Sequence, residues 1–82
     1  MIIKYPLSTE KAIRLMESEN KLVFVVDKKA TKQEIKKAIE DTFNVKVEQI
    51  STINDFKGRK KAYVRFSSET PAIDLATRLG LM

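Results

Sequence analysis

The sequence predicts an α+β fold: a small, mostly antiparallel sheet of three or four strands with three helices packed on it, a ferredoxin-like α/β sandwich. Three segments repeat apolar residues with helical spacing, and three short segments are rich in β-branched residues. After an extended start, these segments follow the order α-β-α-β-β-α. With 82 residues, two glycines and two prolines, the chain has room for a single domain, residues 1–82, without a linker.

The first half of the chain starts with an extended stretch, residues 1–6, followed by a helix. Ser8 or Thr9 can accept a hydrogen bond from a free amide of the first helical turn, and Glu10 suits the positive end of the helix dipole. Residues 21–27 predict a strand. Their five consecutive apolar residues do not alternate with polar ones, which is typical of a central strand covered on both faces.

The second helix has the clearest boundaries. Thr31 and Glu34 form a capping box, in which each side chain satisfies a backbone amide at the helix start. Asn44 is the expected stop. The apolar stripe of this helix consists of Ile35, Ala38, Ile39 and Phe43. Residues 45–53 predict the next strand, and a shift in its apolar alternation indicates a β-bulge near Gln49.

The last third of the chain predicts a β-hairpin and a helix. Residues 54–58 form the turn, and residues 60–67 form a strand whose apolar and polar residues alternate between two faces. Pro71 is expected in the first position of the last helix, where its missing amide costs nothing. Gly80 is expected to end this helix. Its apolar stripe consists of Ala72, Ile73, Leu75, Ala76 and Leu79.

Positive charge is concentrated in one short segment. Five of the 16 basic residues lie within residues 57–65, which contain no acid; 11 basic residues remain elsewhere, against 11 acidic ones. The chain outside this segment is therefore formally neutral. We expect the five cations to be uncompensated and to bind a polyanion, with RNA phosphates as the partner. The alternative is a strand edge protected from aggregation by its charge.

The candidate RNA-binding residues lie mainly on this predicted hairpin. Tyr63 offers a ring for stacking among the basic side chains, and Gly58 allows a tight turn. A second basic group surrounds the second helix, where nearby acids favour a solvated face; it consists of Lys28, Lys29, Lys32, Lys36 and Lys37. The full set of candidates is Lys4, Tyr5, Lys11, Lys36, Lys57, Gly58, Arg59, Lys60, Lys61, Tyr63 and Arg65.

The composition argues against an enzyme. The sequence has no His and no Cys, so the usual base, nucleophile and soft metal ligand are missing. No acidic spacing indicates a metal site, and no glycine-rich loop indicates a bound nucleotide. We expect no cofactor, no metal and no small-molecule substrate. The longest apolar run has five residues, whereas a membrane span needs about 20, and no signal peptide is evident.

Four segments, taken in order, resemble one known family. They are residues 6–11 (PLSTEK), 30–36 (ATKQEIK), 43–47 (FNVKV) and 60–66 (KKAYVRF). Together they resemble the universal large-subunit ribosomal protein twenty-three, in a compact form similar to its archaeal members. This resemblance implies binding to large-subunit ribosomal RNA near the exit of the nascent-chain tunnel, in the cytoplasm. It also implies contacts with ribosomal protein twenty-nine and with the signal recognition particle or other exit-site factors.

The same resemblance assigns RNA contact to Lys60, Lys61, Tyr63 and Arg65. It makes Glu10 a candidate for partner docking, although a carboxylate at a helix start also has a purely structural role. Bacterial members carry a long loop before the KKAY motif. Only six residues separate Ile53 from Lys60 here, so a tunnel-probing loop is not expected.

Two other readings of the sequence remain open. The first is an RNA-recognition motif, because residues 62–66 resemble the end of its signature strand. Lys61 then occupies a position where that motif has an aromatic residue, the first helix has no counterpart, and a fourth strand is missing. The second is a protein-interaction module that binds no nucleic acid.

Overall fold

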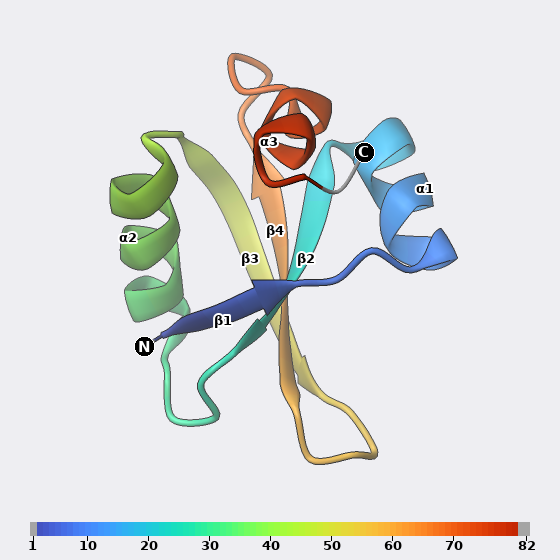
Figure 1. The fold of residues 1–82 in the computed structure, drawn as a ribbon. Coiled ribbons are helices and arrows are strands. Elements are labelled where there is room, and N and C mark those ends of the chain that lie inside the picture. Colours follow the sequence, from blue (N-terminus) through green and yellow to red (C-terminus); the bar gives the residue numbers. More distant parts are fainter. Residues whose placement is uncertain (1, 81–82) are drawn as a thin grey trace.

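The computed structural model describes residues 2–80 and has the predicted α+β architecture (Figure 1). The elements are β1 (Ile3–Pro6), α1 (Glu10–Glu19), β2 (Lys21–Val26), α2 (Lys32–Phe43), β3 (Val47–Asn54), β4 (Lys60–Phe66) and α3 (Ala72–Arg78). Four strands form one antiparallel sheet, in the order β1-β2-β4-β3. The choice left open between three and four strands is thus decided by β1, which is the predicted extended start.

The sheet brings together strands that are far apart in sequence. Since β4 lies between β2 and β3 and is antiparallel to both, α2 joins two parallel strands across the strand between them. β1 lies at the edge of the sheet beside β2, so the N-terminal segment supplies the fourth strand. In the view of Figure 1, α2 lies to the left of the strands and α1 to the right, and α3 lies between them at the upper end.

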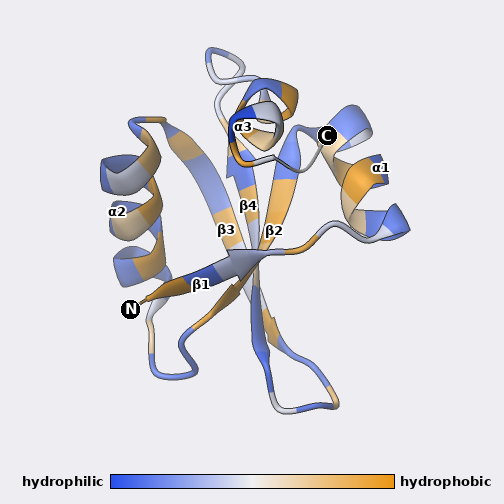
Figure 2. Ribbon diagram, in the orientation of Figure 1, coloured by the Kyte–Doolittle hydropathy of each residue, from blue (hydrophilic) through white to orange (hydrophobic). Residues whose placement is uncertain are grey.

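One face of the sheet forms the main core. Phe24 of β2 and Val64 of β4 are fully buried, together with Ile35 and Ile39 of α2. All three helices contribute to this cluster, and Figure 2 shows hydrophobic segments in orange on each of them. β2 is buried along residues 22–26, so the prediction of a central strand covered on both faces is confirmed. Ile73, by contrast, was placed in the apolar stripe of the last helix and is 46% exposed; that assignment was wrong, because it lies off the stripe formed by its buried neighbours.

The predicted local signals are mostly confirmed. Thr9, not Ser8, caps α1, and Thr31 and Glu34 form the capping box of α2. Asn44 ends α2 in the left-handed conformation, and a register shift in β3 lies between Val47 and Gln49. The exception is Pro71, which is the N-cap of α3 and not its first helical residue.

Asn20 has a structural role that the sequence did not reveal. It ends α1 with φ 56°, and its amide nitrogen donates to three carbonyl oxygens, those of Phe66, Ser67 and Thr70, at 3.1 to 3.2 Å. Its side-chain oxygen accepts a hydrogen bond from the backbone amide of Ala72 at 2.6 Å, at the start of α3. One side chain therefore joins the end of α1, the end of β4 and the start of α3.

Candidate nucleic-acid interface

The turn between β3 and β4 is organised by Asp55. One oxygen of its carboxylate accepts hydrogen bonds from the backbone amides of Lys57, at 2.9 Å, and Arg59, at 2.8 Å. Its own backbone amide donates to the carbonyl of Arg59, and the amide of Gly58 donates back to the carbonyl of Asp55. Gly58 has φ +80°, a left-handed conformation that most other residues adopt only with strain. The hairpin tip is thus a closed, hydrogen-bonded turn.

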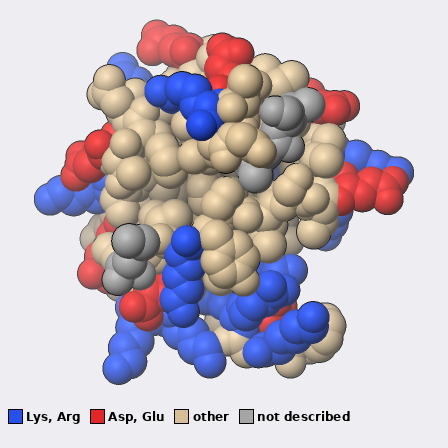
Figure 3. Space-filling model, in the orientation of Figure 1, with Lys and Arg blue, Asp and Glu red and all other residues tan. Residues whose placement is uncertain are grey.

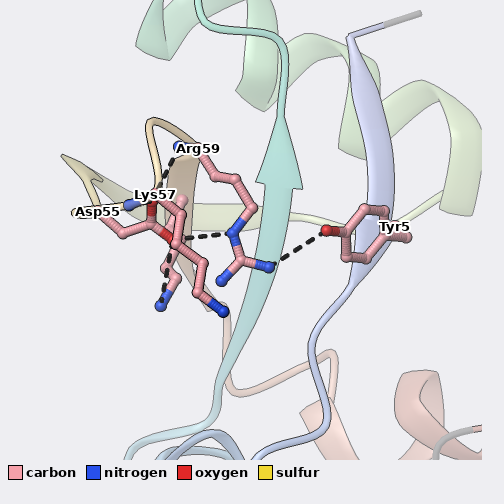
Figure 4. Close-up of polar contacts among 5 residues, drawn as sticks. Tyr5, Asp55, Lys57 and Arg59 are labelled. Atoms are coloured by element: carbon pink, nitrogen blue, oxygen red, sulfur yellow. Dashed lines mark hydrogen bonds and ion pairs between the residues drawn. The ribbon is translucent and has the colours of Figure 1, made fainter.

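The same carboxylate also holds basic side chains on the sheet. The side chain of Asp55 is only 6% exposed; its second oxygen accepts a hydrogen bond from Nε of Arg59 at 2.8 Å and lies 4.0 Å from Nζ of Lys61. Arg59 then donates from Nη1 to the hydroxyl of Tyr5 at 3.3 Å (Figure 4). Tyr5 belongs to β1, so this chain of contacts ties the hairpin to the edge strand, 54 residues away in sequence.

These contacts keep Asp55 ionised. Burial alone raises the pKa of its carboxyl, but hydrogen bonds from Arg59 and Lys57 outweigh that effect and leave the pKa below its usual value. The hydrogen bonds of Arg59 to Tyr5 and Asp55 in turn raise the pKa of its guanidinium. The pKa of Asp27, in the β2–α2 loop, is also lowered, mainly by a hydrogen bond from the amide of Lys29.

We expect the contribution of Asp55 to stability to vanish in acid. Its pKa is lower in the folded than in the unfolded state, so its stabilisation is complete above about pH 4 and is lost as the pH falls through the folded pKa. Urea unfolding at neutral pH should show D55N less stable than the natural chain, and the difference should shrink toward zero at low pH. A difference that does not change with pH would contradict this role.

The fold gathers further cations around this turn. Nζ of Lys28, in the β2–α2 loop, lies 3.4 Å from the position that a Cβ atom on Gly58 would occupy. Nζ of Lys60 donates to the carbonyl of Ala30 in the same loop at 2.6 Å. Lys4 of β1 is close enough to Asp27 to lower the pKa of its carboxyl. Three separate segments thus contribute to one positively charged region.

We call this region the basic end. It consists of Lys4, Lys28, Lys29, Lys57, Arg59, Lys60 and Lys61, with the acids Asp27 and Asp55. In Figure 3, Lys and Arg side chains gather at the lower end of the molecule, where Figure 1 places the β2–α2 loop and the β3–β4 hairpin. Seven cations and two anions give a charge of +5, which leaves nine basic and nine acidic residues elsewhere. The whole net charge of the chain therefore resides here.

The expectation of five uncompensated cations on one ribbon was wrong. Arg59 and Lys61 share the carboxylate of Asp55, which lies just outside the segment, and Arg65 lies 3.9 Å from Glu48 at the other end of β4. Lys60 pairs with Val26 on the core-facing side of the sheet and is half-buried. Among the residues described, Lys57 is the one cation of the five without an ion pair or a hydrogen bond from its side chain.

The remaining candidates lie apart from the basic end or at its border. Tyr63 is half-buried on the face that carries Lys61, opposite Val23 and Ser51. The exposed Lys11 and Lys36 lie on α1 and α2, and among residues 2–80 no ion pair joins either to the acids of the basic end. Conversely, Lys28 and Lys29 had been grouped with the second helix as a solvated face, yet the fold places Lys28 beside the hairpin. Sequence reasoning missed this because the contact joins loops 30 residues apart.

Glu10 lies at the exposed start of α1. Its carboxylate accepts a hydrogen bond from Arg14 at 2.9 Å, one helical turn later, and both side chains are largely exposed. Among residues 2–80, no helix is long and apolar enough to span a membrane, and no group of three or more acids, His or Cys is arranged to hold a metal ion.

Comparison with known proteins matches residues 1–76 to the family described as Ribosomal protein L23. The chain is 44% identical over 81 residues to large ribosomal subunit protein uL23 of Tetrahymena thermophila, covering 99% of this chain and 54% of that protein. It is 45% identical over 80 residues to the protein of the same name from Methanococcus aeolicus, covering 98% of this chain and 93% of that protein. The chain thus spans about half the length of the first relative and nearly all of the second.

The α+β fold, the concentrated positive charge and these matches together define a ribosomal protein of the large subunit, a structural class and not an enzymatic one. The chain belongs to the Ribosomal protein L23 family. The resemblance drawn from its four motifs is thereby confirmed over nearly the whole chain, and the RNA-recognition motif is not its family.

Proposed function

We propose that this protein binds large-subunit ribosomal RNA through the basic end and thereby fixes its domain in the subunit. The observation that carries this proposal is the charge distribution. The entire excess of +5 lies on two adjacent loops and the strand ends beside them, whereas the rest of the chain is neutral. Such a concentrated positive surface suits a partner with closely spaced phosphates.

Five cations of the basic end fall into two groups, those held by an ion pair and those exposed without one. Arg59 and Lys61 are held by Asp55, so they present donors at fixed positions to RNA, which is recognised largely by its shape. Lys28, Lys29 and Lys57 are exposed and supply charge that adapts to neighbouring phosphates. Tyr63 is proposed to contribute at the border of this surface, and Lys11, Lys36 and Arg65 to contact RNA from other parts of the domain.

A salt titration tests the proposal. Binding of the purified protein to deproteinised large-subunit ribosomal RNA is measured by filter retention over a series of salt concentrations. Neutralisation of four or five phosphates is expected to give a log–log slope of roughly −3 to −4, at about 0.7 per contact for single strands. An affinity that does not change with salt would overturn the proposal and leave a protein-interaction module as the remaining reading.

We further propose that the domain lies near the exit of the nascent-chain tunnel of cytoplasmic ribosomes. Ribosomal protein twenty-nine is the proposed neighbour, and the signal recognition particle or another exit-site factor is proposed to dock at Glu10. Glu10 and the basic end are separate surfaces, since Glu10 pairs with Arg14 within α1 and Figure 1 draws α1 away from the hairpin. RNA binding at one surface leaves the other accessible.

The variant E10Q tests this docking site. The ion pair with Arg14 is exposed, so its loss should change the free energy of unfolding by less than about 0.5 kcal/mol. Ribosomes carrying E10Q are expected to retain the protein through a high-salt wash but to bind the signal recognition particle more weakly in co-sedimentation. Unchanged binding of the particle would limit Glu10 to its role at the helix start.

A further inference from the structure

Phe56 is the most exposed large apolar side chain among the described residues, at 95%, and it lies at the tip of the β3–β4 hairpin. An aromatic ring in water gives up the free energy that burial would provide. Phe56 contributes nothing to the core, and the turn is closed by contacts of its neighbours. The position therefore suits a residue that becomes buried against a partner.

The hairpin holds this ring in a defined place. The residues on both sides of Phe56 are fixed by hydrogen bonds. The backbone amide of Asp55 donates to the carbonyl of Arg59, and the carboxylate of Asp55 accepts a hydrogen bond from the amide of Lys57. Gly58 closes the turn through its amide, 3.1 Å from the carbonyl of Asp55. A side chain on such a turn loses little backbone freedom on binding, which favours its use as an anchor.

The surroundings of the ring indicate the chemistry of its partner. Nζ of Lys57 lies 5.9 Å from the centroid of the Phe56 ring, within reach of a cation–π contact. Lys28 and Arg59 lie next to the same turn. Burial of Phe56 against an apolar protein surface would also strip water from these cations, at a cost in free energy. A nucleotide offers instead a base for the ring and a phosphate for the cations.

We propose that Phe56 stacks on an unpaired base of large-subunit ribosomal RNA, while Lys57 and Lys28 contact the flanking phosphates. This inference rests on the proposed RNA-binding function and specifies its target, a loop or bulge with a base free to stack. Aromatic stacking on bases is largely independent of sequence, and paired bases in a continuous helix do not offer their faces.

The chain has no tryptophan, so F56W introduces a single fluorescent reporter at the tip. The probe is deproteinised large-subunit ribosomal RNA. F56W is expected to bind with nearly the natural affinity. RNA should quench its tryptophan emission, and the bound tryptophan should be less accessible to quenching by acrylamide. F56A is expected to lose about 10- to 100-fold in affinity, with the salt slope unchanged because no charge is altered.

I73A is the matched control, since Ile73 is exposed on α3, at the opposite end of the molecule from the hairpin in Figure 1. It should bind RNA as the natural chain does, and circular dichroism should show the same unfolding midpoint for F56A and the natural chain.

Unaltered RNA affinity in F56A, or a tryptophan in F56W that acrylamide still quenches in the complex, would overturn the stacking proposal. In either case a steep salt slope would still support RNA binding, whereas a flat one would refute both proposals.

Discussion

Replacement of Lys28, Lys29 and Lys57 together by glutamine is expected to weaken binding to large-subunit ribosomal RNA about 100-fold at roughly 0.1 M salt. Each phosphate contact contributes about 0.7 to the log–log slope, so three contacts add about two powers of ten between 1 M and 0.1 M salt. The slope itself should become less steep by about 2. These three side chains are exposed and form no ion pair within the described part of the chain, so the fold should be unaffected.

The control carries the same change in charge elsewhere. Lys37, Lys46 and Arg78 are exposed on parts of the molecule outside the basic end, and their replacement by glutamine should reduce RNA affinity much less. Filter binding of both triple variants at several salt concentrations provides the comparison. Equal losses would mean that RNA is attracted by net charge alone and that the basic end has no particular role.

Lys60 and Lys61 are less suitable for this test. Nζ of Lys60 donates to the carbonyl of Ala30, and Lys61 lies beside the carboxylate of Asp55. Charge reversal at these two positions would place a carboxylate near a carbonyl oxygen and another near Asp55. We therefore expect such a variant to lose stability as well as RNA affinity, so that its weaker binding would not isolate a contact with RNA.

N20A is expected to be the most destabilising of the variants considered, by about 3 kcal/mol in the free energy of unfolding. The replacement removes the side-chain hydrogen bonds to Phe66, Ser67, Thr70 and Ala72. It also places alanine at φ 56°, a left-handed conformation that asparagine tolerates better because its short polar side chain bonds locally, a difference of up to about 1 kcal/mol. For a domain of this size, the unfolding midpoint should fall by about 15 °C.

Asn44 provides a matched control within the same chain. It ends α2 at the same φ of 56°, but within residues 2–80 no hydrogen bond from its side chain links it to another element. N44A should therefore lose only the conformational part, the lower tolerance of alanine for the left-handed region, up to about 1 kcal/mol. Thermal or urea unfolding of both variants measures the difference. If the two were equally destabilised, the hydrogen bonds of Asn20 would contribute nothing beyond the left-handed cap.

Much of the secondary structure could be predicted because its signals are local. The capping box at Thr31 and Glu34 specifies where α2 begins, and both side chains act within one helical turn. The alternation along residues 60–66 defines which side of β4 faces the core. Even the bulge in β3 was visible, since a one-residue slip reverses the alternation of apolar residues.

The candidate interface was harder to predict, because charge along the sequence does not specify which ions meet in space. Counting acids within residues 57–65 missed Asp55, two positions earlier, whose carboxylate holds both Arg59 and Lys61. Phe56 was read only as part of a turn, although an apolar residue among turn residues was a usable signal.

The sequence by itself determined the order of the elements, their main boundaries, the excess of positive charge and the family. Only the tertiary structure decided that β1 completes the sheet, that Lys28 lies beside Gly58 and that Asn20 connects three elements. The reason is physical. Caps and periodic patterns depend on neighbours within a few residues, whereas a strand's place in a sheet and the partners of an ion depend on the packing of the whole chain.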